Sequence, residues 1–217
     1  MKISILSQKE SWINDYLSRW ILDLSGEHEI SWVHRQDALK GGDILFILSF
    51  WSIVARRYIE QFSSAVVVHE SDLPKGRGWS PVSWQILEGK NIIPITLFRA
   101  AEKVDSGEIY LRDQIELEGH ELIDEIRKKQ AMKTIELCKK FIESYPDILE
   151  KGIPQKGEVT YYRKRTPEDS RLDISKTLHE QFNLFRIADN EKYPAFFDYK
   201  GQRYILKISK FSSMKND

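Results

Sequence analysis

The fold is decided by the stretch Val66-Val67-Val68-His69-Glu70-Ser71-Asp72-Leu73-Pro74-Lys75-Gly76-Arg77-Gly78. An apolar β-branched run is typical of a buried strand, and the proline and glycines behind it are typical of a loop. The strand therefore delivers His69 to its carboxyl end. Further along, Val104-Asp105-Ser106-Gly107 predicts a tight turn that presents a carboxylate. A histidine and an aspartate brought to one sheet edge can transfer protons near neutral pH.

Strand and helix patterns alternate on both sides of this stretch. Apolar runs predict strands at 3–6, 30–33, 43–50, 65–68 and 92–98, and helical spacing predicts helices at 11–24, 53–62 and 81–88. This alternation predicts an α/β fold, a Rossmann-like parallel sheet with helices on both faces. Ligands of such sheets bind beyond the carboxyl ends of the strands, where His69 is expected.

The second half of the chain divides at a cluster of breakers. Short extended pieces at 109–111 and 114–117 precede a long amphipathic helix at 121–145, and Pro146, Gly152 and Pro154 then mark a boundary. We expect a catalytic domain at 1–150 and a C-terminal extension at 151–217 that contacts the substrate. The extension is expected to hold a helix at 175–185 and a β-hairpin at 195–208.

Composition narrows the function classes. The 217 residues carry 33 Lys and Arg against 33 Asp and Glu, and this zero net charge argues against a general nucleic-acid binder. Cys138 is the single cysteine, so neither an internal disulfide nor a cysteine metal cluster is expected. The first apolar stretch is too short for a signal peptide and no run has membrane-spanning length, which predicts a cytoplasmic protein without a membrane partner.

Two common phosphate-binding motifs are missing. Ser7-Gln8-Lys9-Glu10 follows the first strand in place of a glycine-rich loop, and there is no Walker A sequence. The generic nucleotide-binding reading is therefore disfavoured. The other histidines show no metal-ligand spacing, so no metal is expected.

The ordered series His69-x-Ser71-x-Leu73-Pro74, Arg77-Gly78, Gly89, Thr96 and Val104-Asp105-Ser106-Gly107 resembles the folate-dependent formyltransferases. The resemblance covers roughly 43 to 140 and includes the Ser-aromatic loop at Leu48-Ser49-Phe50-Trp51. It implies 10-formyltetrahydrofolate as cosubstrate. It also implies His69 as general base and Asp105 as the residue that orients it.

One position departs from the family pattern, whose asparagine two residues before the histidine is Val67 here. Valine cannot donate to an oxyanion, and losing one such donor typically costs on the order of 10²–10³ in rate. Either protonated His69 or a backbone N–H near Ser71 or Arg77 substitutes, or the chain is a repurposed relative.

The remaining patterns concern the acceptor. Methionyl-tRNA formyltransferases carry a larger basic C-terminal domain, and this chain is expected to be too short and too low in net charge to bind tRNA. It also lacks the N-terminal phosphate loop of the purine-pathway enzymes. The segment 160–170 and the stretch around Tyr193 resemble sugar N-formyltransferases of bacterial surface-polysaccharide pathways related to pseudaminic acid. The expected acceptor is the 4-amino group of a UDP-linked 4-amino-4,6-dideoxy-N-acetylhexosamine. A homodimer is expected by the same resemblance.

The resemblance also assigns binding residues. The folate cleft is expected to be lined by Phe50, Trp51, Trp84, Leu87, Phe98 and Val104, and the substrate site by Ser71, Arg77, Tyr161, Arg163, Arg186, Asn190 and Tyr193. Two alternatives stay open. One is formyl transfer to another amine, of an amino acid or peptide, and the other is a catalytically weak relative that binds folate or a nucleotide sugar.

Overall fold

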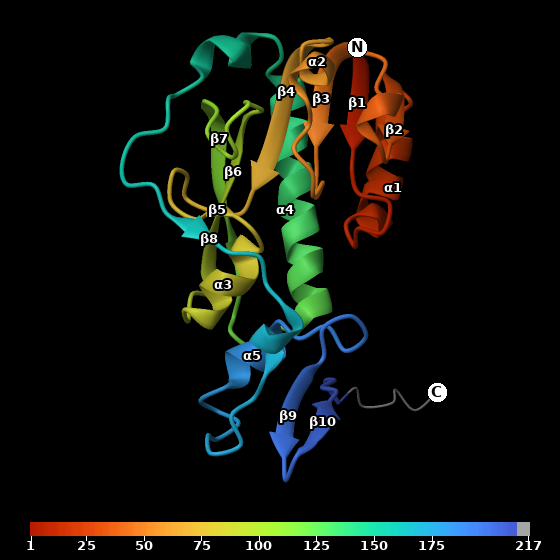
Figure 1. Ribbon diagram of the computed structural model, residues 1–217. Coiled ribbons are helices and arrows are strands. Elements are labelled where there is room, and N and C mark those ends of the chain that lie inside the picture. Colours follow the sequence, from red (N-terminus) through yellow and green to blue (C-terminus); the bar gives the residue numbers. More distant parts are fainter. Residues whose placement is uncertain (212–217) are drawn as a thin grey trace.

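The computed structural model describes residues 1–211, and a six-stranded sheet forms its centre (Figure 1). The strand order is β2-β1-β3-β4-β6-β7, and β1 to β4 are mutually parallel. The strands are β1 (Lys2–Leu6), β2 (Glu29–Val33), β3 (Gly42–Ile47), β4 (Phe62–His69), β6 (Ile92–Arg99) and β7 (Ile109–Glu116). The α/β fold with a mainly parallel sheet is confirmed, and the two short extended pieces predicted at 109–117 are one strand.

Helices connect the strands and cover the sheet. The α-helices are α1 (Asn14–Leu24), α2 (Arg56–Ile59), α3 (Pro81–Leu87), α4 (Ile123–Glu143) and α5 (Phe182–Arg186). Short 3-10 turns lie at η1 (Gln36–Ala38), η2 (Asp147–Lys151) and η3 (Pro167–Ser170). The long helix α4 runs along one face of the sheet beside α1 (Figure 1).

β6 runs antiparallel to β4, which the strand–helix alternation did not predict. A parallel arrangement needs a connection that returns along the whole sheet. The seven-residue helix α3 is only about 10 Å long, whereas an eight-residue strand spans roughly 26 Å. The connection therefore stays at the edge where β4 ends, and β6 starts from that edge in the opposite direction.

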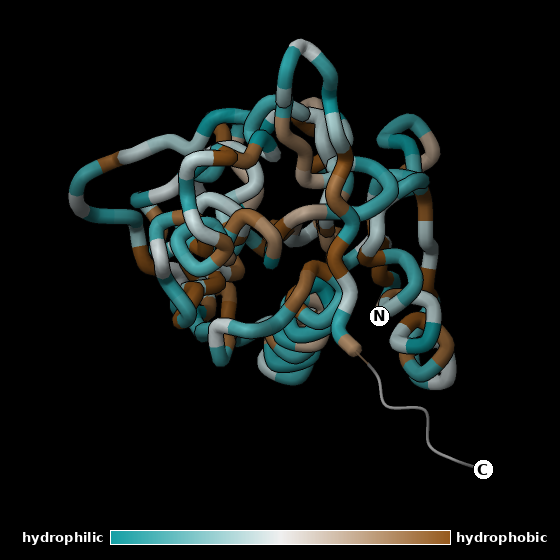
Figure 2. The backbone as a smooth tube through the Cα atoms, turned by 90° about the horizontal axis from the view of Figure 1, so that it is seen from below, coloured by the Kyte–Doolittle hydropathy of each residue, from teal (hydrophilic) through white to brown (hydrophobic). Residues whose placement is uncertain are grey.

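The sheet separates two apolar layers. The larger one lies between the sheet and α1 and α4, where Phe46, Phe141 and Tyr110 meet edge to face. The smaller one includes Leu45, Val54 and Phe62. In Figure 2 the hydrophobic segments lie mainly inside the outline, and the protruding loops are mostly hydrophilic. Cys138 is buried in the larger layer, and burial raises the pKa of its thiol. Its side chain therefore packs in the core as a small apolar group.

The chain after α4 runs back along the molecule and ends in a small subdomain (Figure 1). Its two-residue strand β8 (Tyr161–Tyr162) pairs with β5 (Arg77–Gly78). The predicted hairpin is confirmed and consists of β9 (Ala195–Tyr199) and β10 (Gln202–Leu206). The helix predicted at 175–185 is wrong except at its end, because the Gln181 side chain bonds the carbonyls of Asp173, Lys176 and Thr177. Among residues 1–211, no helix is long and apolar enough to cross a membrane.

Candidate active site

The structure brings His69 and Asp105 together. His69 ends β4 and is 7% exposed, and its Nε2 lies 3.8 Å from Oδ2 of Asp105. Asp105 belongs to the loop between β6 and β7. Because Arg99 pairs with Val66, this loop starts behind the end of β4 and extends forward to reach His69. The loop between β6 and β7 therefore brings Asp105 back to His69, because the carboxyl ends of β4 and β6 do not lie at the same edge of the sheet.

Hydrogen bonding fixes which ring nitrogen of His69 can act as a base. Nε2 lies 2.9 Å from the carbonyl oxygen of Gly76. A carbonyl oxygen only accepts, so Nε2 carries the hydrogen and donates it. In the neutral ring the lone pair is therefore on Nδ1, and His69 lines the open cleft described below. This geometry provides a proton acceptor, and the nearby Asp105 carboxylate stabilises the imidazolium once formed.

Hydrogen bonds from Gly78 and Gln155 hold the Asp105 turn. Asp105 adopts a left-handed φ of 49°, and its Oδ2 accepts a 2.9 Å bond from the N–H of Gly78. The side-chain amide of Gln155 donates to the carbonyls of Asp105 and Gly107, each at 2.9 Å. Its oxygen accepts a 2.6 Å bond from the buried Arg77 guanidinium. Gln155 thus joins the Arg77 loop to the Asp105 turn, and we expect it to be a positioning residue.

Replacing Gln155 separates these two contacts. Gln155→Ala removes both, and Gln155→Glu keeps an acceptor for Arg77 but has no donor for the two carbonyls. We expect both variants to lower kcat about tenfold or more, because a misplacement near 1 Å can cost 10²-fold. The alanine variant leaves the guanidinium and both carbonyls without a partner, and the glutamate variant places a carboxylate oxygen against the two carbonyls, so both should lose about 1–3 kcal/mol of stability. Turnover and denaturant unfolding measured on both would test this, and an unchanged kcat in the glutamate variant would contradict it.

A cleft of about 660 Å³ runs past His69 and Asp105. Its walls come from the loops after β1, β3, β4 and β6, from the first half of α4 and from the C-terminal subdomain. The size suits a small organic ligand. Residues that line it include Trp12, Ser49, Phe50, Trp51, Val67, His69, Glu70, Trp79, Phe98, Val104, Asp105, Arg127, Gln130, Lys164, Arg165, Lys192 and Tyr193.

The residues expected to bind folate divide into two groups. Phe50, Trp51, Phe98 and Val104 line the cleft. Trp84 and Leu87 do not. The Trp84 ring stacks on Tyr162 and carries the Arg163 guanidinium over its face, and Leu87 packs against the main core.

Of the residues expected to bind substrate, Tyr193 lines the cleft and the others do not. Tyr161 and Arg163 are exposed outside it, and Arg163 is paired with Asp169. Ser71 and Arg77 are buried within the segment between β4 and α3. Their direct contact with substrate is not supported by these positions.

Two further expectations in the C-terminal subdomain are corrected. Arg186 is 1% exposed and its guanidinium is bonded within the fold, by Glu121, Asn91 and Asn183. Asn190 uses both ends of its amide on the backbone of Ile208, at 2.7 and 3.1 Å. Arg186 thus joins the subdomain to the first part of the chain, and Asn190 holds the end of the subdomain together.

The structure also adds residues that the predicted set lacked. Trp79, Arg165, Lys192, Glu70 and Gln130 all line the cleft. Arg165 belongs to the segment 160–170, whose resemblance pointed to this region. No local signal marked Gln130, because it reaches the site through the packing of α4.

The N–H groups of Ser71 and Arg77 do not replace the donor missing at Val67. The N–H of Ser71 bonds the carbonyl of His69 at 3.0 Å, and the N–H of Arg77 bonds the carbonyl of Thr160 at 3.0 Å. Both expected backbone donors are therefore occupied. Of the substitutes considered, protonated His69 and the other N–H groups of this loop remain, as does the alternative of a repurposed relative.

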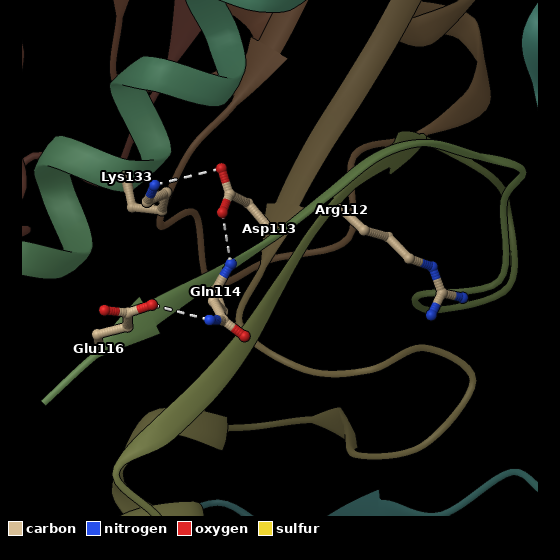
Figure 3. Close-up of a pocket in the computed structure, with 5 residues that line it drawn as sticks. All are labelled: Arg112, Asp113, Gln114, Glu116 and Lys133. Carbon is tan, nitrogen blue, oxygen red and sulfur yellow. Dashed lines mark hydrogen bonds and ion pairs between the residues drawn. The ribbon is translucent and has the colours of Figure 1, made fainter.

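A second hollow, between β7 and α4, is lined by charged and polar side chains (Figure 3). Lys133 is bonded to Asp113, and Gln114 to Glu116, whereas Arg112 points away toward Asp72 and the carbonyl of Leu73. These groups satisfy one another. Within residues 1–211 no group of three His, Cys, Asp or Glu side chains is arranged to hold a metal ion.

Comparison with known proteins agrees with this geometry. Residues 22–140 match the family model described as "Formyl transferase". A methionyl-tRNA formyltransferase of Coprothermobacter proteolyticus is 28% identical over 162 residues, which are 74% of this chain and 52% of that protein. The chain thus spans about half the length of this curated relative.

Solved structures share the fold. A methionyl-tRNA formyltransferase from Clostridium thermocellum superposes with a TM-score of 0.79 at 22% identity, over 99% of this chain and 95% of that one. A 4-N formyltransferase from Francisella tularensis gives 0.69 at 18% identity, over 97% and 98%.

Proposed function

Because the chain belongs to the formyl transferase family, we propose that it transfers a formyl group to the amino group of a nucleotide-linked amino sugar. This family uses formyltetrahydrofolate as the donor. We propose residues 1–150 as the catalytic part and 151–217 as the part that contacts the acceptor. The acceptor we favour is UDP-4-amino-4,6-dideoxy-N-acetylhexosamine.

The wall of the cleft fits the donor. Phe50, Trp51, Phe98 and Val104 supply apolar and aromatic surface for a flat pterin beside Asp105. When bound there, the folate supplies the formyl carbon. Its N10 atom is the leaving group and takes up a proton.

His69 and Asp105 provide the proton transfer. Nδ1 of His69 takes a proton from the attacking amine, and the resulting imidazolium returns it to the departing N10 atom. Asp105 stabilises that imidazolium from 3.8 Å. Because Val67 cannot donate, the imidazolium is also the donor that faces the developing oxyanion, so one group performs both tasks.

The observation that carries the acceptor assignment is Arg165, which lines the cleft, as Tyr193, Lys164 and Lys192 also do. Arg165 makes only long bonds to Asp169 and Ser170, at 3.4 and 3.3 Å, and its buried Nε has no partner. Burial lowers its pKa, so an anion would relieve the desolvated guanidinium. A pyrophosphate supplies that anion, and Tyr193 offers a surface for a base.

Mass spectrometry of acceptors tests the proposal directly. The protein would be incubated with 10-formyltetrahydrofolate and a panel of UDP-, dTDP- and GDP-linked amino sugars, amino acids and initiator methionyl-tRNA. We expect one formyl group to be gained by an amino sugar alone. Transfer to the tRNA or to an amino acid would support formyl transfer but contradict the proposed acceptor. Binding of the ligands without transfer would favour a repurposed relative.

Two nearby arginines give a matched test of the anion site. Arg165→Gln should raise KM for the nucleotide sugar about 10–100-fold with a smaller change in kcat, because a charge-assisted bond contributes about 1.5–3 kcal/mol. Arg163→Gln, outside the cleft, should leave KM near the wild-type value. Equal KM values for both variants would remove Arg165 from the acceptor site.

A further inference from the structure

Glu70 directly follows His69 in the chain and lines the same cleft. Its backbone carbonyl accepts a 2.7 Å bond from the side chain of Gln85 in α3. Its carboxylate accepts a 2.7 Å bond from the amide of Gln130 in α4. Two helices therefore fix a carboxyl group in the wall next to the proposed base.

The carboxyl group of Glu70 has no cationic partner among residues 1–211. Gln130 is neutral, and Arg127, one helical turn earlier on α4, is paired with Asp189 at 2.8 Å. Burial raises the pKa of Glu70, the charge of His69 opposes this rise, and the charge of Asp105 adds to it. A desolvated carboxylate without a cation is costly, so this wall favours a ligand that brings positive charge.

We propose that Glu70 binds the acceptor amine as its ammonium ion and removes the first of its protons. The inference rests on the proposed function, because it requires an amine acceptor. It assigns recognition of the reacting nitrogen to a residue outside the histidine–aspartate pair.

Proton accounting explains why a second base is needed. An ammonium nitrogen carries three hydrogens and the product formamide nitrogen carries one, so two protons must leave. The first passes to Glu70 and then to water, which leaves a neutral nucleophile. As the new bond forms between nitrogen and the formyl carbon, the second passes to Nδ1 of His69. It then moves to N10 of the folate when the bond between N10 and that carbon breaks. His69 ends unchanged, and one proton is released per turnover.

The test is Glu70→Gln, which keeps the side-chain length and a hydrogen bond with Gln130 but removes the charge and the basicity. The control is Glu118→Gln, since Glu118 is an exposed residue paired with His120. kcat/KM would be measured from pH 6 to about 10 with 10-formyltetrahydrofolate and UDP-4-amino-4,6-dideoxy-N-acetylhexosamine, or the panel amine that the wild type formylates.

We expect Glu70→Gln to lose about 10²-fold at neutral pH and to recover as the pH approaches the pKa of the amine, where neutral amine is abundant. The variant should not be less stable. A raised carboxyl pKa means that the folded wild type loses stability as pH rises through it, and the glutamine variant lacks that loss.

Three outcomes would count against the inference, and they differ from one another. Wild-type rates at every pH would show that Glu70 takes no part. A loss of equal size at every pH would indicate a structural role only. Failure of the wild type with every amine in the panel would overturn the proposed function, and the inference with it.

Discussion

Replacing His69 with alanine is expected to lower kcat by about 10²–10⁴-fold, the range usual for loss of a general acid–base group. The loss should lie toward the upper end, because we propose the same imidazolium as the donor to the oxyanion in a chain where Val67 replaces the family's asparagine. Single-turnover formyl transfer under saturating folate would measure the chemical step. His69 packs at a strand end, so binding of folate should persist.

The matched control is His120→Ala. His120 is an exposed histidine paired with Glu118, and its removal should change neither turnover nor folding. A His69→Ala variant that folds, binds folate and still turns over at the wild-type rate would exclude the proton transfer assigned to this residue.

Much of the fold could be predicted because short sequence patterns indicate which residues are buried. The run at 65–68 is apolar on both faces, as a central strand must be, and it appears within β4. The hairpin around Lys200 and Gly201 is equally local, since both residues adopt the left-handed φ that the turn requires. Signals of this kind depend on neighbours in sequence.

The predictions were wrong or incomplete where residues far apart in the sequence determine a strand direction or the role of a side chain. The direction of β6 depends on whether α3 is long enough to recross the sheet, which periodicity does not reveal. Arg186 has the chemistry of an anion-binding residue, but Glu121 pairs with it inside the fold, 65 residues away. Gln155 had no sequence signal, because its role is defined by carbonyls of a turn 48 and 50 residues earlier.

The proximity of His69 and Asp105 followed from the family resemblance and from no local rule. Strand direction alone would have separated them, because β6 carries the chain away from the edge at which β4 ends. The returning loop brings them together, and this loop depends on close contact with the end of β6. Its geometry is therefore the most sensitive point of the site.

Gly107→Ala should displace that loop. A Cβ at position 107 would lie 1.8 Å from the carbonyl oxygen of Arg99 and 2.7 Å from its carbonyl carbon, both backbone atoms of β6. The turn must move by about 1 Å or more to relieve this overlap, and a shift of that size can cost 10²-fold in rate. Asp105, two residues earlier, would move with it, and the bond from Gln155 to the carbonyl of Gly107 would weaken.

We therefore expect Gly107→Ala to lower kcat about 100-fold and to destabilise the fold by about 1–3 kcal/mol through overpacking. Gly26→Ala is the control, since the nearest atom to its added Cβ is at 3.6 Å, an ordinary contact. Steady-state kinetics and denaturant unfolding of both variants would show the difference. Should Gly107→Ala lose the expected stability and yet keep wild-type turnover, the position of Asp105 against His69 would not limit the reaction, and its proposed orienting role would have to be given up.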